Sequence, residues 1–217
     1  MAGAGSAAHG GNNGAIDVRQ WAGLGYFALT VEYRLVTCTP APACYEDVLC
    51  AIRWVHAHAA EYHLDTSRLY LIGMSAGGHM VSLAATLGQG RLASRGGWED
   101  QPSDFTAAIS VSGAYDLRKL SWGSGWQPIG EPWDEARGYA SPIEHVAADN
   151  RPLLLLHSDD DGSVPVDQAT SMAAALEAAG ARHRFLHYTD RGHMPITDAV
   201  IAASQAFIGE VEARQVR

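Results

Sequence analysis

Lysine is almost absent from the chain, since Lys119 is the only one among 217 residues and arginine supplies the rest of the basic charge. The formal net charge is −9, and the basic residues are scattered rather than clustered. Nucleic acids and anionic membranes attract proteins through clustered positive charge, so neither is expected as a main partner. No apolar run reaches membrane-spanning length, and the sequence shows no basic segment followed by an apolar one, as a secretion signal would have. These absences predict a cytoplasmic location.

Cysteine is also scarce, with three residues confined to one segment: Cys38, Cys44 and Cys50. No Cys-x-x-Cys pair occurs, and the spacing matches no common zinc pattern, so no metal site is expected. An odd number of cysteines without a secretion signal favours reduced thiols over a Cys38–Cys44 disulfide.

The composition, 47% apolar and 18% charged, is that of a globular chain with room for one good core. Apolar runs alternate with amphipathic segments along it. Strands are predicted at 25–33, 68–75, 105–115, 152–158 and 183–189, and helices at 44–63, 76–88, 166–179 and 196–213. This alternation predicts one α/β domain over residues 1–217, with a mostly parallel sheet flanked by helices on both faces.

Two segments, 88–104 and 116–145, are rich in glycine, proline and tryptophan and are expected to be irregular. Long irregular segments over a parallel sheet commonly shape a pocket or lid. Packing is the simpler role for each of their tryptophans, with at least one expected to line a pocket: Trp98, Trp122, Trp126 and Trp133.

The motif GMSAG, residues 73–77, carries the strongest chemical signal. A serine with glycine two residues away on each side fits a very tight strand-to-helix turn that raises the hydroxyl of Ser75 above the sheet. The pattern is common by chance and also fits a simple turn. Here an apolar strand precedes it and a helix follows, which favours Ser75 as a nucleophile.

A serine nucleophile needs a base and an acid that orients the base, both after later strands. HSDDDGSVP (157–165) follows one such strand, and DRGHMP (190–195) follows the last one. The order Ser, Asp, His is that of the α/β-hydrolase arrangement, and it makes His193 the candidate base. Three further histidines share one predicted helix without converging on a metal: His56, His58 and His63.

Taken together, these motifs resemble an α/β-hydrolase carboxylesterase. The resemblance rests on HGG (9–11), YRL (33–35), the stretch from 46 to 79, SPI (141–143), HSDDDGSVP and the final GH. It covers residues 9 to about 195 and is closest to hormone-sensitive-lipase-like carboxylesterases, bacterial feruloyl- or acetylxylan-type esterases and kynurenine formamidase. It implies an ester-hydrolysing serine enzyme that uses no cofactor.

The resemblance also selects the acid among three consecutive aspartates. The family pattern His-Gly-x-x-Asp-x-x-Val-Pro, aligned on Val164, makes Asp161 the acid, with Asp159 as the alternative. Asp159 and Asp160 are expected to form the turn and accept its N–H bonds. Ser158 stands where the family has glycine.

The oxyanion of the tetrahedral intermediate needs fixed N–H donors. One expected donor is the backbone of Ala76, directly after the nucleophile. The family's HGG loop implies Gly10 and Gly11 as the others, because a backbone without Cβ can approach the reacting carbon closely. Asn12 and Asn13 follow here, where many relatives continue with glycine or an aromatic residue.

The short segment before HGG raises a question of support. The resemblance places a strand there, between the strands at 25–33 and 68–75, and MAGAGSAA is a poor central strand. Two further leading strands of the family have no counterpart here. The gap can be met by a thin Ala/Gly strand, by direct pairing of the flanking strands, or by a strand from another subunit. An exposed edge is adhesive, so a homo-oligomer is expected.

The sequence thus predicts hydrolysis of a small-molecule ester, with short loops favouring small or aromatic esters over long lipids. A formamidase or peptidase of the same fold is one alternative, and comparing N-formylkynurenine with short acyl esters separates it. A catalytically impaired binding protein is another, which would leave Ser75 unlabelled by a fluorophosphonate.

Overall fold

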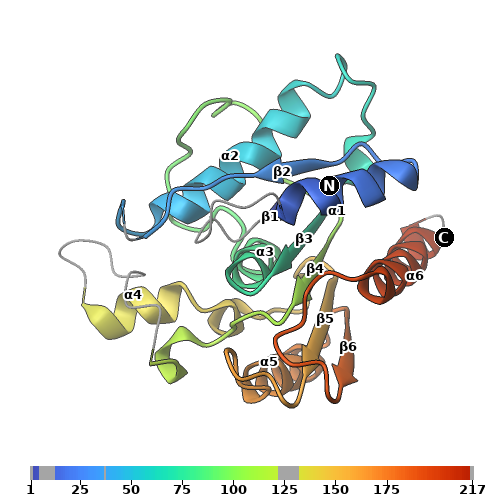
Figure 1. The fold of residues 1–217 in the computed structure, drawn as a ribbon. Coiled ribbons are helices and arrows are strands. Elements are labelled where there is room, and N and C mark those ends of the chain that lie inside the picture. The colour runs from blue at the N-terminus through green and yellow to red at the C-terminus, as the bar shows by residue number, and fades with distance from the viewer. Residues whose placement is uncertain (1, 5–12, 37, 122–131, 216–217) are drawn as a thin grey trace.

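A parallel β-sheet runs through the middle of the molecule (Figure 1). The structure is a computed structural model that describes residues 2–4, 13–36, 38–121 and 132–215. The strands are β1 (Ala2–Ala4), β2 (Leu29–Val31), β3 (Tyr70–Met74), β4 (Ala107–Val111), β5 (Leu153–Ser158) and β6 (His183–Tyr188). They lie in the order β2-β1-β3-β4-β5-β6, and each of these neighbouring pairs is parallel.

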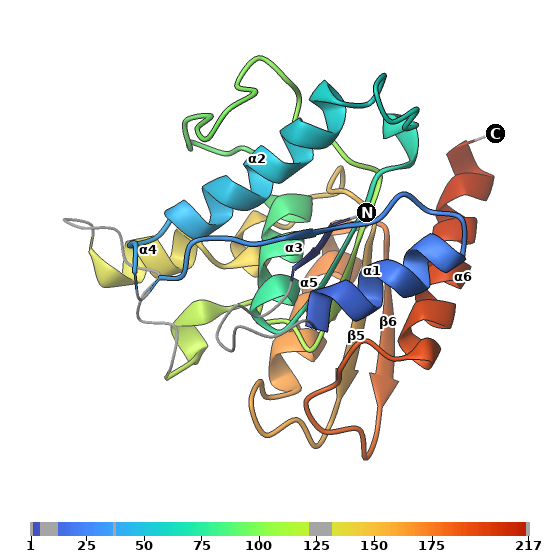
Figure 2. The same cartoon turned by 45° about the horizontal axis from the view of Figure 1, so that its top comes forward.

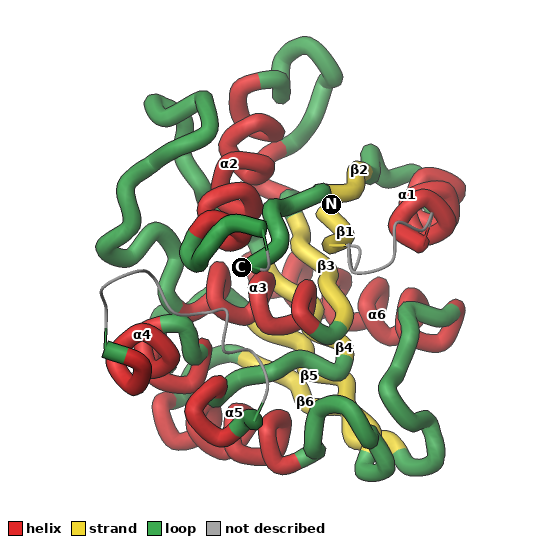
Figure 3. The backbone as a smooth tube through the Cα atoms, turned by 60° about the vertical axis from the view of Figure 1, so that its left-hand side comes forward, coloured by secondary structure: helices red, strands yellow, loops and turns green. Residues whose placement is uncertain are grey.

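Helices cover both faces of this sheet. They are α1 (Asn13–Gly23), α2 (Ala43–Ala57), α3 (Ala76–Thr86), α4 (Trp133–Tyr139), α5 (Asp167–Ala179) and α6 (Asp198–Gln215). Short 3₁₀ segments also occur: η2 (Thr66–Arg68), η3 (Leu117–Lys119) and η4 (Pro142–His145). Figure 3 shows α1 and α6 on one side of the sheet and α2, α3 and α5 on the other.

The alternation of side chains along each strand explains this double cover. Leu71 packs in an apolar cluster with α2, α3 and α5, whereas its neighbours Tyr70 and Ile72 pack with α1 and α6. Leu153 and Leu154 divide between the same two clusters. A strand buried on both faces is mostly apolar, and this is why β5 begins with four consecutive leucines rather than an alternating pattern.

The predicted strands and three of the predicted helices form close to their expected positions. The helix predicted at 44–63 instead ends at Ala57. The imidazole Nδ1 of His58 lies 2.8 Å from the carbonyl oxygen of Trp54, and the two rings stack with centroids 4.4 Å apart. The Trp54 carbonyl also accepts the backbone N–H of His58 at 3.0 Å, so both groups of His58 cap the last turn of the helix. Helix α1 was not expected, and Trp21 from it is almost fully buried.

The thin Ala/Gly strand is the outcome that the structure shows for the N-terminal segment. Ala4 of β1 is level with Val31 of β2 on one side and with Gly73 of β3 on the other. β1 therefore separates β2 from the strand that leads into Ser75. Residues 5–12, which include the HGG loop, lie outside the described residues.

The segment 88–104 contains no helix or strand and is held down by α2. Arg53 of α2 is 1% exposed, and its guanidinium donates to the carbonyl oxygens of Arg95 and Gly97. The segment 132–145 is more regular than predicted, since α4 and η4 lie within it.

No helix in the described part of the chain is long and apolar enough to cross a bilayer. The three cysteines all lie among the described residues and form no disulfide with one another.

Candidate active site

Ser75 lies in a strained turn between β3 and α3. Its φ is 54° and its ψ is −117°, a backbone conformation that a residue with a side chain rarely adopts. The Ser75 N–H donates to the carbonyl oxygen of Val111 at 2.8 Å, and the Ser75 carbonyl accepts from the His79 N–H at 2.9 Å. The turn is thus anchored to β4 on one side and to the first turn of α3 on the other.

Gly73 shows why this turn needs glycine. A Cβ at Gly73 would lie 2.3 Å from both the carbonyl carbon and the oxygen of Gly77 and 2.9 Å from the Gly78 nitrogen. All three are backbone atoms, which cannot rotate away. The close passage of α3 over β3 is therefore incompatible with any side chain at Gly73, which is the physical basis of the GMSAG pattern.

Asp161 is buried in the turn after β5. One carboxylate oxygen accepts from the N–H groups of Ser163 and Val164, each at 2.9 Å. Burial by itself raises the pKa of Asp161, but the bonds from Val164, His193 and Ser163 outweigh it and hold that pKa below its usual value. Asp161 is therefore ionised at neutral pH.

His193 is the group that faces this carboxylate. Its Nδ1 lies 2.8 Å from Oδ2 and 3.0 Å from Oδ1 of Asp161, so Nδ1 carries the proton and donates. The side chain of Asp161 is fully buried, whereas that of His193 is 24% exposed. The structure thus pairs Asp161 with His193, whereas no contact between Asp159 and His193 occurs among the described residues. The other ring nitrogen, Nε2, is left as the basic atom.

The end of β4 joins the serine turn to the histidine loop. Val111 accepts the Ser75 N–H, and the hydroxyl of the next residue, Ser112, accepts the Met194 N–H at 3.0 Å. Ser75 is therefore bonded to the last residue of β4, and the residue after His193 is bonded to the residue that follows it. Among the described residues, Ser75 Oγ makes no hydrogen bond, and such bonds are often long in ligand-free sites.

Two residues near this site were not singled out as functional from the sequence. Ser112, fully buried with a φ of 47°, is visible in the sequence merely as a polar residue after an apolar strand. His157 is also fully buried, and its Nε2 donates to the Val164 carbonyl at 2.8 Å and lies 3.4 Å from Asp161 Oδ2. Burial lowers the pKa of His157, so the ring is a neutral support behind Asp161.

The predicted oxyanion donors are only partly within the described residues. Ala76 is the first residue of α3, so its N–H has no acceptor inside the helix. This N–H lies at the positive end of the helix dipole, where negative charge is stabilised. Gly10 and Gly11 lie outside the described residues, as do Trp122 and Trp126.

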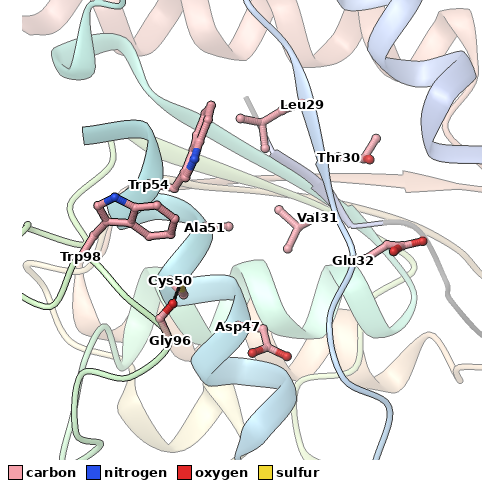
Figure 4. Close-up of a pocket in the computed structure, with 10 residues that line it drawn as sticks. All are labelled: Leu29, Thr30, Val31, Glu32, Asp47, Cys50, Ala51, Trp54, Gly96 and Trp98. Carbon is pink, nitrogen blue, oxygen red and sulfur yellow. Dashed lines mark hydrogen bonds between the residues drawn. The ribbon is translucent and has the colours of Figure 1, made fainter. Parts of the chain in front are cut away.

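A pocket of about 450 Å³ lies at a different place, along the outer edge of β2 (Figure 4). Trp54 and Cys50 of α2, Leu29 and Val31 of β2, and Trp98 line it. β1 separates it from β3, and Ser75, Asp161 and His193 do not line it. Trp98 thus lines a pocket, but one that lies apart from the candidate catalytic residues.

Histidine, cysteine and acidic side chains form no metal-binding group of three or more in the described part of the chain. What the site offers instead is the hydroxyl of Ser75, the imidazole of His193 oriented by a buried carboxylate, and an N–H at the start of a helix. This set can perform nucleophilic attack with proton transfer.

The fold is that of an α/β-hydrolase, and solved structures agree. A truncated form of a carbohydrate esterase from gut microbiota matches with a TM-score of 0.83 and 25% identity, covering 98% of this chain and 85% of that one. The butyrate-bound esterase Est2 of Thermogutta terrifontis shares the fold with a TM-score of 0.76 and 23% identity, covering 99% and 81% of the two chains.

The BD-FAE family model matches residues 5–176, and the chain belongs to that family. It is 33% identical over 167 residues to the probable carboxylic ester hydrolase LipM of Mycobacterium tuberculosis, covering 70% of this chain and 38% of that protein. It is 32% identical over 168 residues to the esterase LipQ of the same organism, covering 73% and 40%. The chain therefore spans about two fifths of the length of these curated relatives.

Proposed function

We propose that the protein is a serine carboxylesterase that hydrolyses small or aromatic carboxylic esters through an acyl-enzyme. The observation that carries this proposal is the bond from His193 to the buried carboxylate of Asp161, with the loop of His193 and the turn of Ser75 both bonded to the end of β4. Membership of the BD-FAE family and the esterase names of the relatives support ester hydrolysis as the reaction.

The first step forms the acyl-enzyme. Ser75 Oγ attacks the ester carbonyl carbon while its proton passes to His193 Nε2. The carbonyl oxygen becomes an oxyanion, which the Ala76 N–H stabilises, with Gly10 and Gly11 as the further proposed donors. Asp161 stabilises the imidazolium. The tetrahedral intermediate then collapses, and the alcohol leaves with the proton from His193.

The second step repeats this chemistry with water. His193 removes a proton from a water molecule, whose oxygen attacks the acyl carbon. Collapse of the second intermediate returns a proton to Ser75 Oγ and releases the carboxylic acid.

Replacing Ser75 tests the proposal. Wild-type protein is expected to hydrolyse p-nitrophenyl acetate and butyrate and to be labelled on Ser75 by a fluorophosphonate. Ser75→Ala is expected to lose both while keeping its thermal unfolding temperature. Ser94→Ala, at an exposed serine of the segment 88–104, is the matched control and keeps both. Unchanged turnover in Ser75→Ala would refute the assignment, and turnover of N-formylkynurenine without ester turnover would refute the substrate class.

A further inference from the structure

The histidine loop, residues 190–195, is held in place by side chains rather than by regular secondary structure. Two of its residues have left-handed backbone conformations, Asp190 with a φ of 56° and Gly192 with a φ of 57°. The N–H groups of Arg191, Gly192 and Met194 all donate to side-chain oxygens. The position of His193 therefore depends on those acceptors.

We propose that Ser158 and Asp160 form a clamp that positions His193 for catalysis, an inference that rests on the proposed function. Asp160 Oδ1 accepts from the Gly192 N–H at 2.9 Å and from the Arg191 N–H at 3.1 Å. Ser158 Oγ accepts from the same Arg191 N–H at 3.1 Å and donates to Asp160 Oδ1 at 2.5 Å. These bonds join the end of β5 to the two residues before His193.

Asp160 is a stronger acceptor when it is ionised. Hydrogen bonds from a hydroxyl to a carboxylate are stronger than bonds between neutral groups. The Ser158 hydroxyl, together with the Gly192 N–H, lowers the pKa of Asp160, so the clamp carries its charge at neutral pH. Glycine, the family residue at this position, would supply neither the hydroxyl donor nor the acceptor for Arg191.

The two adjacent aspartates therefore do different work. Asp161 bonds the imidazole of His193, and Asp160 bonds the backbone that carries it. The side-chain hydrogen bonds described for the fully buried Ser158 and the exposed Asp160 go to each other and to the histidine loop, not to the serine turn, so both are positioning residues. Positioning matters because a displacement of about 1 Å between reacting groups can cost roughly 10²-fold in rate.

Three variants test the clamp with p-nitrophenyl acetate as substrate. Asp160→Ala is expected to lower kcat by about 10- to 100-fold, with KM changed less than about twofold, because the base is displaced while the substrate pocket is not. Asp160→Asn keeps an acceptor oxygen and is expected to recover most of that loss. Ser158→Ala is expected to cost less than Asp160→Ala, because Arg191 keeps Asp160 as acceptor. Asp149→Ala, at an exposed aspartate before β5, is the control.

Amide hydrogen exchange gives a readout that does not need activity. In Asp160→Ala, the Gly192 and Arg191 amides are expected to lose protection, while the Ala181 amide, bonded to the Leu176 carbonyl, keeps it. Wild-type kcat in Asp160→Ala, or an Asp160→Asn variant as slow as Asp160→Ala, would overturn the clamp, as would unchanged protection of Gly192. If wild-type protein turns over no ester, the proposed function fails while the exchange experiment still decides the clamp.

Discussion

Adding one methyl group at Gly73 tests the geometry of the serine turn most directly. In Gly73→Ala the new Cβ would lie 2.3 Å from the Gly77 carbonyl carbon and oxygen, far inside van der Waals contact. Because the opposing atoms are backbone, α3 must move away from β3. Overpacking of this kind typically lowers the free energy of unfolding by about 1–3 kcal/mol. Because the new Cβ meets backbone atoms that cannot rotate away, we expect the upper end of this range, about 3 kcal/mol. For a chain of this size the expected fall in Tm is roughly 6–12 °C.

Two assays measure this effect, thermal unfolding for stability and fluorophosphonate labelling of Ser75 for the turn itself. Both are expected to decline in Gly73→Ala. Gly209→Ala is the matched control, since a Cβ there meets nothing within 4 Å and lies inside α6. It is expected to stabilise the helix by up to about 1 kcal/mol. A Gly73→Ala variant with a Tm within about 2 °C of wild type and normal labelling would refute the steric reasoning.

Two further predictions concern the buried ionisable groups. Asp161→Asn presents an amide to His193 Nδ1 and favours the wrong tautomer of the imidazole, so kcat is expected to fall by about 10⁴-fold. Asp159→Asn is expected to keep its kcat. If p-nitrophenyl acetate assays gave the reverse order, Asp159 rather than Asp161 would be the acid. Burial lowers the pKa of His79 to about 4, from about 6.5 in the unfolded chain. The stability from its neutral ring is therefore complete above about pH 6.5 and is lost as the pH falls toward 4, by up to about 1.4 kcal/mol per pH unit. The free energy of unfolding can be measured by urea unfolding at several pH values between about 4 and 6.5. Plotted against pH, it is expected to have a slope in His79→Gln that is smaller than in wild type by the equivalent of about one proton. Equal slopes in the two proteins would contradict this.

The parts of the site that follow from short-range rules could be predicted from the sequence. The glycines around Ser75 meet a local steric requirement, because a Cβ at Gly73 would collide with the backbone of Gly77. The GMSAG pattern in the sequence is the direct sign of this requirement. The choice of Asp161 relied on spacing to Val164, and the structure gives the reason, since Asp161 accepts the Val164 N–H that closes the turn. Asp160 accepts loop N–H bonds, as predicted, but they come from the histidine loop, whereas Asp161 accepts the N–H groups of the turn itself.

The rest depends on contacts between segments far apart in the sequence. The N–H groups that donate to Asp160 and Ser112 lie on the histidine loop, and no local pattern shows which loop will reach these two acceptors. Helix α1 was not predicted, and among its described side chains Trp21 is the one that is buried in the core. The apolar pattern of residues 44–63 gave no sign that α2 ends at Ala57, where His58 caps the last turn.

The placement of β6 has a consequence for partly unfolded states. β6 is the last strand in the sheet order, beside β5 in Figure 2, and its residues are half-buried or exposed, whereas β4 and β5 are buried throughout. Outer, less buried elements open with less free energy than the core. A chain whose β6 has detached would keep Ser75 in the turn after β3 and Asp161 in the turn after β5. His193, which follows β6, would no longer be held against Asp161. Loss of ester turnover would then precede global denaturation, and the remaining core would still look native by its helix content.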